Sequence, residues 1–313
     1  MYTAPAVFAV LVNTIAILTM LFVFEEKYAG LVNDKVKKDG QKVYIPKYDR
    51  LALFACYLGR FTQMFIFTNV ETLATPFAMT IFAWTKSQAV SYISLSHVGV
   101  SLVELVMYVG FVLFKMDRFI NLRLTCIVGF IGFGLYYVGT FSWPFVDGHL
   151  KTFTEQDYNS YLSGNATEPV GCNVDHLSWC DSVKPVNIWL YFFSYVFIMG
   201  ASFCLVNITL NTVFSQVIGP RRQATHQGIL QMIGSCGRLV GPLVISTMYT
   251  VFGPPITWCL QILVLVATLS VWISVYKRLI PLEVPENPSQ IVPKTIDDKI
   301  QIENLKSLKK LVE

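Results

Sequence analysis

The chain is a succession of long apolar segments separated by shorter polar ones. Because a bilayer core about 30 Å thick needs roughly 20 helical residues to cross it, each segment of that length predicts a membrane-spanning helix. The segments lack the alternating pattern of a barrel strand. Seven spans are predicted, at Tyr2–Phe24, Phe61–Trp84, Gln88–Phe114, Leu124–Phe145, Ile188–Ile218, Thr225–Val251 and Pro255–Tyr276.

The start of the second span is ambiguous. Residues Leu51–Gly59 are also apolar, and a span that includes them would place Arg60 inside the membrane. A span that starts at Phe61 and ends at Trp84 already has the required length. We therefore expect Arg60 to lie at the membrane interface.

Composition supports the membrane assignment. Of 313 residues, 24 are basic and 20 are acidic, which makes 14% charged, whereas 54% are hydrophobic. A soluble domain has about 25% charged residues. These values exclude a disordered or nucleic-acid-binding chain, and they predict an all-α polytopic bundle whose main partner is the lipid bilayer.

The basic residues separate by side. The segments that would face one side of the membrane hold 19 of the 24 Lys and Arg, and those facing the other side hold three. By the positive-inside rule the amino terminus is lumenal and the carboxyl terminus is cytosolic. The predicted organisation is a helix at 1–24, a cytosolic linker at 25–50, a six-helix half-bundle at 51–278 with a lumenal loop at 146–187, and a cytosolic tail at 279–313.

The predicted lumenal loop has two features of an oxidising compartment. Asn165-Ala166-Thr167 is a glycosylation sequon, so Asn165 is the expected acceptor. Cys172 and Cys180 share this loop, whereas the other five cysteines lie in or beside apolar segments. We therefore predict a disulfide between them.

Ionisable residues inside a membrane are costly and usually face a cavity. Glu71 lies near the middle of the second span. The third span places Ser94, His97, Ser101, Glu104 and Tyr108 at steps of three and four residues, which puts all five on one helical face. That face predicts a cavity lining; the alternative is a seam of hydrogen bonds between helices.

The sixth span contains Gln231 and Arg238 along one face. Arg238 lies about four turns beyond Ala224, too far to reach the cytosol easily. It needs a partner, and Glu71 and Glu104 are the acids at comparable depth. We expect an ion pair between Arg238 and one of them across the cavity.

Proline and glycine mark candidate hinges. Pro76 follows Glu71 by five residues, and Gly241-Pro242 interrupts the sixth span. Proline removes a backbone donor and allows a helix to bend. Close helix packing explains the glycines of this span equally well.

No enzyme motif is present: the sequence contains no HExxH and no phosphate loop, and we found no Ser-His-Asp set. Cofactor and metal sites are likewise not predicted.

Several segments together resemble a lysosomal branch of the major facilitator superfamily. They are Met1–Pro5, Glu71–Pro76, Trp84–Val90, Gly171-Cys172 with Trp179-Cys180, Gly237–Pro242 and Val275–Ile280. The resemblance covers nearly the whole chain and corresponds to the family's sixth helix, central cytosolic loop and helices seven to twelve.

The resemblance implies transport of a small solute or an anion, with chloride as a candidate, across an endolysosomal membrane. Glu71, His97 and Glu104 would then couple protons or ions, Ser101 and Gln231 would line the pathway, and Arg238 would contact the anion. Because these transporters bind substrate between two halves, an amino-terminal half or a second copy is an expected partner. The alternative is a truncated isoform or incomplete gene model without transport, acting at most as a partner-binding membrane protein.

Overall fold

A computed structural model describes residues 3–25, 47–164, 167–220 and 223–282. The sequon residue Asn165, most of the predicted linker and most of the predicted tail lie outside these ranges. The chain divides into two units, 1–43 with 220–222, and 44–219 with 223–313. In the first unit, helix α1 (Ala4–Phe22) is apolar apart from Asn13, Thr14 and Thr19, and it has Pro5 in its first turn, where a missing N–H costs nothing.

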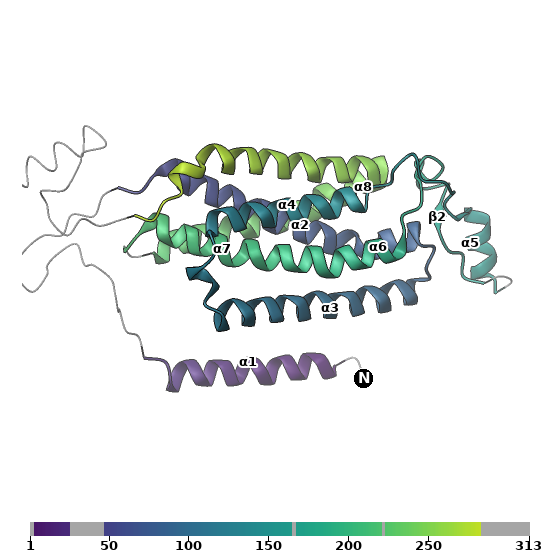
Figure 1. Cartoon of the computed structure of the whole chain (residues 1–313). Coiled ribbons are helices and arrows are strands. Elements are labelled where there is room, and N and C mark those ends of the chain that lie inside the picture. Colours follow the sequence, from purple (N-terminus) through teal and green to yellow (C-terminus); the bar gives the residue numbers. More distant parts are fainter. Residues whose placement is uncertain (1–2, 26–46, 165–166, 221–222, 283–313) are drawn as a thin grey trace, which may run out of the picture. The chain divides into compact units, whose positions relative to one another are not determined.

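The second unit is almost entirely helical (Figure 1). Its long elements are α2 (Arg50–Ile81), α3 (Lys86–Leu113), α4 (Leu122–Gly139), α7 (Gly200–Ile218) and α8 (Ala224–Val275). The shorter helical elements are η1 (Met116–Arg118), α5 (Glu155–Leu162), α6 (Ile188–Phe193), the π-helical segment η2 (Ser194–Met199) and η3 (Tyr276–Arg278). Two short parallel strands, β1 (Thr152–Phe153) and β2 (Cys172–Asn173), pair within the long loop.

Five helices among the described residues are long and apolar enough to cross a membrane. One of them is α8, which contains the last two predicted spans and changes direction at Gly253, its one residue with non-helical φ and ψ. With α8 counted as two spans and α1 as a shorter apolar helix, the seven predicted spans are accounted for. The fold class predicted from the sequence, an all-α membrane bundle, is confirmed.

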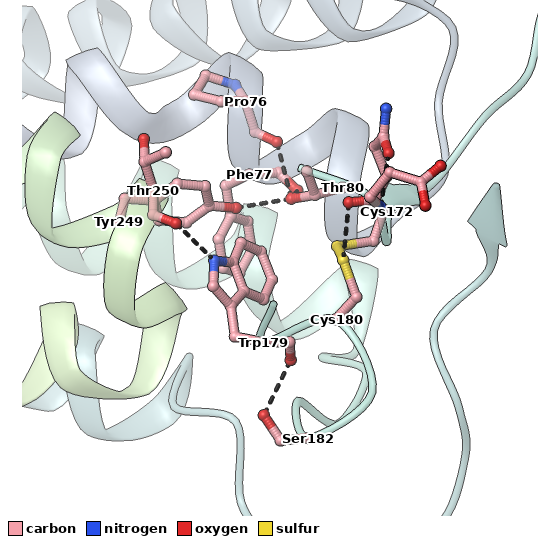
Figure 2. Close-up of a disulfide and its surroundings, with 11 residues drawn as sticks. Pro76, Phe77, Thr80, Cys172, Trp179, Cys180, Ser182, Tyr249 and Thr250 are labelled. Atoms are coloured by element: carbon pink, nitrogen blue, oxygen red, sulfur yellow. Dashed lines mark hydrogen bonds between the residues drawn. A yellow bond between two sulfur atoms is a disulfide. The ribbon is translucent and has the colours of Figure 1, made fainter. Parts of the chain in front are cut away.

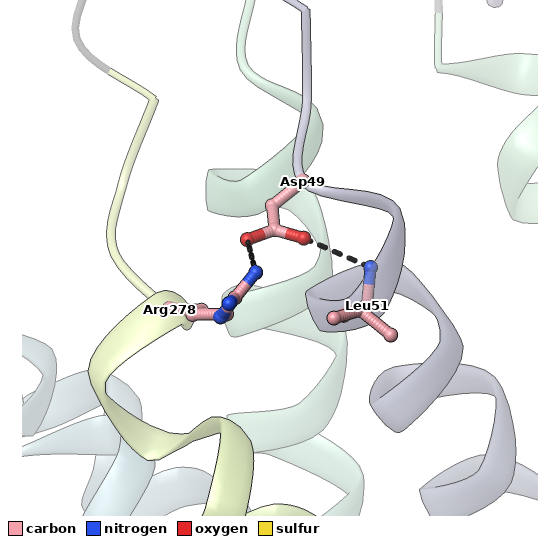
Figure 3. A network of polar contacts seen from close by, with 3 residues as sticks. All are labelled: Asp49, Leu51 and Arg278. Carbon is pink, nitrogen blue, oxygen red and sulfur yellow. Dashed lines mark hydrogen bonds and ion pairs between the residues drawn. The ribbon is translucent and has the colours of Figure 1, made fainter. Parts of the chain in front are cut away.

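The first helix of the bundle starts earlier than we expected. Asp49 caps α2 by accepting a hydrogen bond from the backbone N–H of Leu51 at 2.9 Å, and it also lies 3.5 Å from Arg278 (Figure 3). Because this cap fixes the helix start at Arg50, Arg60 lies almost three turns inside α2. The predicted helix start at Phe61 was therefore wrong, and Arg60 is buried against neighbouring helices, with 6% of the residue exposed. That Arg60 lies at the membrane interface stays a prediction.

Helices α2 and α8 pack closely because α8 presents glycine to α2. A Cβ atom at Gly237 would lie 2.7 Å from the carbonyl oxygen of Phe61, and one at Gly241 would lie 2.5 Å from the side chain of Asn69. Neither position has room for a side chain. Close packing, the simpler explanation of these glycines, is therefore confirmed.

A disulfide closes part of the long loop, and a tryptophan attaches the loop to one end of the bundle (Figure 2). Cys172 and Cys180 form the predicted disulfide, with their Cα atoms 5.8 Å apart. Trp179 is buried and donates from Nε1 to the carbonyl oxygen of Thr250 at 3.3 Å. The tryptophan packs directly on the turn at Gly253, where a Cβ atom would lie 2.7 Å from its Cγ. Beside them, Thr80 Oγ1 of α2 and Tyr249 Oη of α8 lie 2.6 Å apart. We call all of these contacts together the loop brace.

Candidate transport site

The most extensively hydrogen-bonded charge inside the bundle is Arg60. Its Nη1 donates to Gln63 Oε1 at 2.9 Å and to Asn207 Oδ1 at 2.7 Å, and its Nη2 donates to Gln231 Oε1 at 2.8 Å. The three acceptors come from α2, α7 and α8 respectively. We call these four residues the Arg60 cluster.

Tyr108 orients one member of this cluster. Its hydroxyl accepts a hydrogen bond from Asn207 Nδ2 at 2.7 Å, so the oxygen of the same amide is left to face Arg60. Asn211, one turn further along α7, donates to the backbone oxygen of Asn207 at 2.7 Å. The guanidinium is therefore held by side chains that are themselves held in place.

A second group of ionisable residues lies on α2, α3 and η2. Tyr195 Oη lies 3.2 Å from His97 Nδ1. Glu71 lies within electrostatic reach of His97, and Glu104 lies within reach of Glu71. Tyr195 is also within reach of both carboxyl groups. We call these four residues the acidic cluster.

The local helix geometry explains the position of Tyr195. It lies in the π-helical segment η2, which interrupts the fifth predicted span between α6 and α7. A π-helical segment of this kind occurs often at functional sites, because it rotates the side chains that follow it. The sequence analysis missed Tyr195, since nothing in the apolar run at 188–218 marks the change of helix type.

The polar face predicted on α3 is only partly turned into the bundle. His97, Glu104 and Tyr108 are half-buried, while Ser94 and Ser101 are exposed. His97 and Tyr108 bond to partners on η2 and α7, so the interhelical alternative accounts for part of this face. Ser101 remains a predicted pathway residue that the structure places on the exposed surface of α3.

Arg238 differs from the prediction. Its side chain is exposed on α8, and in the described part of the chain neither Glu71 nor Glu104 comes within ion-pair distance of it. The predicted ion pair is therefore not formed, although Arg238 lies within electrostatic reach of Glu71. The physical reason is the close α2–α8 contact, because Gly237 and Gly241 face α2 and the residue next to Gly237 faces away.

The predicted hinges lie in unbroken helix. Pro76 is inside α2, and its carbonyl oxygen accepts a hydrogen bond from Thr80 Oγ1 at 2.9 Å. Gly241 and Pro242 are inside α8, whose single non-helical residue is Gly253. A hinge role for Pro76, Gly241 and Pro242 stays a prediction.

Several buried polar atoms in this region have no hydrogen-bond partner. They include Arg60 Nε, Glu104 Oε1 and both amide atoms of Asn69. An unpaired polar atom in a membrane interior is expensive, so such atoms usually serve a ligand, an ion or a moving part. The described residues contain no group of three His, Cys, Asp or Glu side chains suited to a metal ion.

Comparison with known proteins agrees with this architecture. Residues 177–310 match the family profile described as Major Facilitator Superfamily. A Xenopus laevis protein named major facilitator superfamily domain-containing protein 8 is 30% identical to the chain over 300 residues, which is 90% of this chain and 58% of that protein. The chain therefore spans little more than half the length of this relative.

Both comparisons support membrane transport in general, because the family consists of transporters and not of enzymes. They confirm that this all-α membrane chain resembles the major facilitator superfamily.

Proposed function

We propose that this protein takes part in moving a small solute or an anion across a membrane, with the Arg60 and acidic clusters lining the pathway. The observation that supports this most directly is Glu104, a half-buried acid in a membrane-spanning helix with Oε1 unpaired. Ionisable residues inside membrane-spanning helices usually mark an ion or substrate pathway.

The acidic cluster suits proton or ion coupling. Glu71 interacts electrostatically with both Glu104 and His97. Protonation of one group would change the charge felt by the others, and so would bias the bundle between two arrangements. Pro76, Gly241 and Pro242 are the positions at which we propose that α2 and α8 bend.

We further propose an endolysosomal location, with chloride as the simplest candidate solute. In that arrangement the amino terminus and the 146–187 loop are lumenal, Asn165 is glycosylated, and 25–50 and 279–313 are cytosolic. An amino-terminal transporter half or a second copy of the chain would cover Ser101 and Arg238, which are exposed here. These proposals rest on the charge distribution of the loops and on the family resemblance.

The test is a flux measurement on the protein reconstituted in liposomes. Chloride efflux is followed at pH 5 and at pH 7 in the unmodified protein, in Glu104→Gln and in His97→Ala. We expect the unmodified protein to show pH-dependent flux and both variants to lose that dependence. Glu155→Gln, which changes an exposed acid in the long loop, is the matched control.

Two results would count against the proposal. Absence of flux of chloride and of small organic solutes in the unmodified protein would contradict transport itself. Unchanged pH dependence in both variants would contradict coupling by the acidic cluster and leave transport standing.

A further inference from the structure

We propose that Arg60 is a binding site for a small monovalent anion, a role that the family resemblance implied for Arg238. The inference rests on the transport function proposed above, and it adds the residue and the ligand chemistry. It begins from burial: the side chain of Arg60 is 6% exposed, although a guanidinium stays charged at any physiological pH.

The donors of Arg60 are only partly used. A guanidinium has five N–H donors, two on each Nη and one on Nε. The two on Nη1 are taken by Gln63 and Asn207, and one on Nη2 is taken by Gln231. The N–H of Nε is buried and has no acceptor. One donor on Nη2 and the donor on Nε therefore remain for a ligand.

The charge of Arg60 is also not balanced. All three acceptors are neutral amides, and within the described ranges no carboxylate lies within ion-pair distance of Arg60. Amide dipoles orient a guanidinium without neutralising it. A buried cation that lacks a counter-ion is strongly destabilising. A bound anion would supply the missing negative charge, and its binding would therefore be favourable.

The two nitrogens that carry the remaining donors both lie beside α8, Nε next to Gly234 and Nη2 next to Gln231. Gln231 is exposed, whereas Gln63 on the opposite side is fully buried. Gly234 follows Gln231 by three residues, and its position leaves only backbone beside Nε, since a Cβ atom there would be 3.3 Å away. Because Nε is buried beside the Gly234 backbone, an anion that reaches it from the Gln231 side must displace the exposed Gln231 side chain and widen the α2–α8 contact at Gly234.

This donor arrangement limits the ligand class. Adjacent N–H groups of one guanidinium suit either the two oxygens of a carboxylate or a single halide ion. The Arg60 cluster itself holds one positive charge, which matches a monovalent anion, and the exposed Arg238 lies within electrostatic reach of it. The shared chemistry is therefore a small monovalent anion, and experiment must distinguish the halide from the carboxylate.

The test is an anion titration of the complete chain in detergent. The melting temperature is measured as sodium chloride, or separately sodium acetate, replaces sodium HEPES at constant ionic strength. We expect a saturable rise with at least one of the two anions. A response to chloride alone indicates a halide site, and one to acetate alone indicates a carboxylate site. A response to both indicates a general monovalent site.

Variants link the response to Arg60. In Arg60→Gln the apparent dissociation constant should weaken by about tenfold or more, because two charge-assisted hydrogen bonds are lost. Arg278→Gln also removes one positive charge, from an exposed position at the end of the bundle, and should leave the response unchanged. An equal response in Arg60→Gln and the unmodified protein, or no response to either anion, would overturn the proposal.

A second variant keeps the test decisive if Arg60→Gln does not fold. Gln231→Glu places a carboxylate 2.8 Å from Nη2, which should preserve the fold and abolish the anion response. A retained response in this variant would overturn the proposal. A flux measurement separates the two hypotheses. Anion binding without flux would support the Arg60 site and contradict the transport function. Flux without Arg60-dependent binding would support the transport function and contradict the Arg60 site.

Discussion

The Arg60 cluster and the loop brace both join α2 to α8, and they differ in how completely their polar atoms are paired. In the loop brace, Thr80 Oγ1 and Tyr249 Oη lie 2.6 Å apart and Trp179 Nε1 has the carbonyl oxygen of Thr250 (Figure 2). In the Arg60 cluster Arg60 Nε has no partner, and further along α2, beside Gly241, neither amide atom of Asn69 has one. The polar side-chain atoms named in the loop brace are hydrogen-bonded, whereas the Arg60 cluster keeps an unpaired donor.

This difference separates stability from function. Paired polar groups and aromatic packing around Trp179 stabilise the end of the bundle that holds the long loop. The unpaired groups near Arg60 reduce the stability of the fold. A cost of this kind is expected at a functional site, where a ligand or a proton binds to the unpaired groups. We therefore expect substitutions in the loop brace to act on folding and substitutions in the two clusters to act on transport.

The largest effect is expected at Gly253. Its φ of +78° is unfavourable for residues with a side chain, and a Cβ atom would lie 2.7 Å from Trp179 Cγ. Gly253→Ala should lower the free energy of unfolding by about 3 kcal/mol, through backbone strain and overpacking together. Thermal unfolding in detergent measures this, with Gly134→Ala as control, because nothing lies within 4 Å of a Cβ at that helical position. Equal stability of the two variants would contradict a rigid loop brace.

Removal of the disulfide should have the next largest effect. The Cys172–Cys180 bond closes a short loop around Trp179, with a sequence separation of 8 residues. Replacing both cysteines by alanine should cost about 2–3 kcal/mol by freeing the unfolded chain. Cys259→Ala, at an exposed free cysteine, is the control and should be near neutral. A double variant as stable as the control would show that the loop brace needs no disulfide.

Loss of one hydrogen bond in the loop brace should be smaller. Tyr249→Phe removes the hydroxyl that lies 2.6 Å from Thr80 Oγ1 and keeps the ring that packs on Trp179. The expected cost is about 1 kcal/mol. Tyr158→Phe, on an exposed face of α5, should cost nothing measurable. An equal effect of both substitutions on the melting temperature would show that the Thr80–Tyr249 hydrogen bond does not stabilise the loop brace.

Glu104→Gln should change stability little. Because Oε1 of Glu104 has no partner, neutralising the carboxyl group removes no hydrogen bond from that atom. We expect the free energy of unfolding to stay within about 0.5 kcal/mol of the unmodified value, or to rise. Thermal unfolding at pH 7 measures this, and a loss comparable to that of the disulfide variant would show that Glu104 is structural.

The smallest effect is expected in the long loop, at Asp157. Asp157 accepts hydrogen bonds from the backbone N–H and the hydroxyl of Thr154, both at 2.9 Å, which hold the pKa of its carboxyl group below the usual value of 3.8. A carboxyl group whose pKa is lower in the folded state stabilises the fold above its unfolded pKa, and this stabilisation disappears as the pH falls through the folded pKa.

Hydrogen exchange in α5 measures this local effect. Protection of the first turn should decrease in the unmodified protein as the pH is lowered from about 5 to about 3. In Asp157→Asn the protection should be low at both values, whereas Asp181→Asn, another exposed position in the same loop, should behave like the unmodified protein. A decrease of equal size in Asp157→Asn would assign the pH dependence to another group.

The all-α membrane fold was predictable because the length of the apolar segments is a strong signal in a membrane protein. The same pattern placed the turn at Gly253 between two predicted spans. The disulfide was predictable from two cysteines in one polar loop. These features depend on the local sequence and on the solvent, and not on which helices become neighbours.

The site was harder to predict because it depends on neighbours. Arg60 looked like a span boundary, since a charged residue after an apolar segment usually marks the membrane surface. The capping residue Asp49, before the apolar run 51–59, was the available signal that α2 starts earlier. The acceptors Asn207 and Gln231 lie 147 and 171 residues away in sequence, and no local pattern connects them to Arg60.

The central claim is that the loop brace stabilises the fold and the two clusters carry transport. Its most direct test is chloride flux per folded molecule, measured in liposomes at pH 5 and pH 7. It compares Glu104→Gln with the double variant Cys172→Ala and Cys180→Ala, each normalised to the protein that remains folded. We predict that Glu104→Gln folds normally and loses pH-dependent flux, while the disulfide variant loses stability and keeps the flux of its folded fraction. Normal flux in Glu104→Gln, together with lost flux in the folded disulfide variant, would contradict the assignment of function to the unpaired clusters.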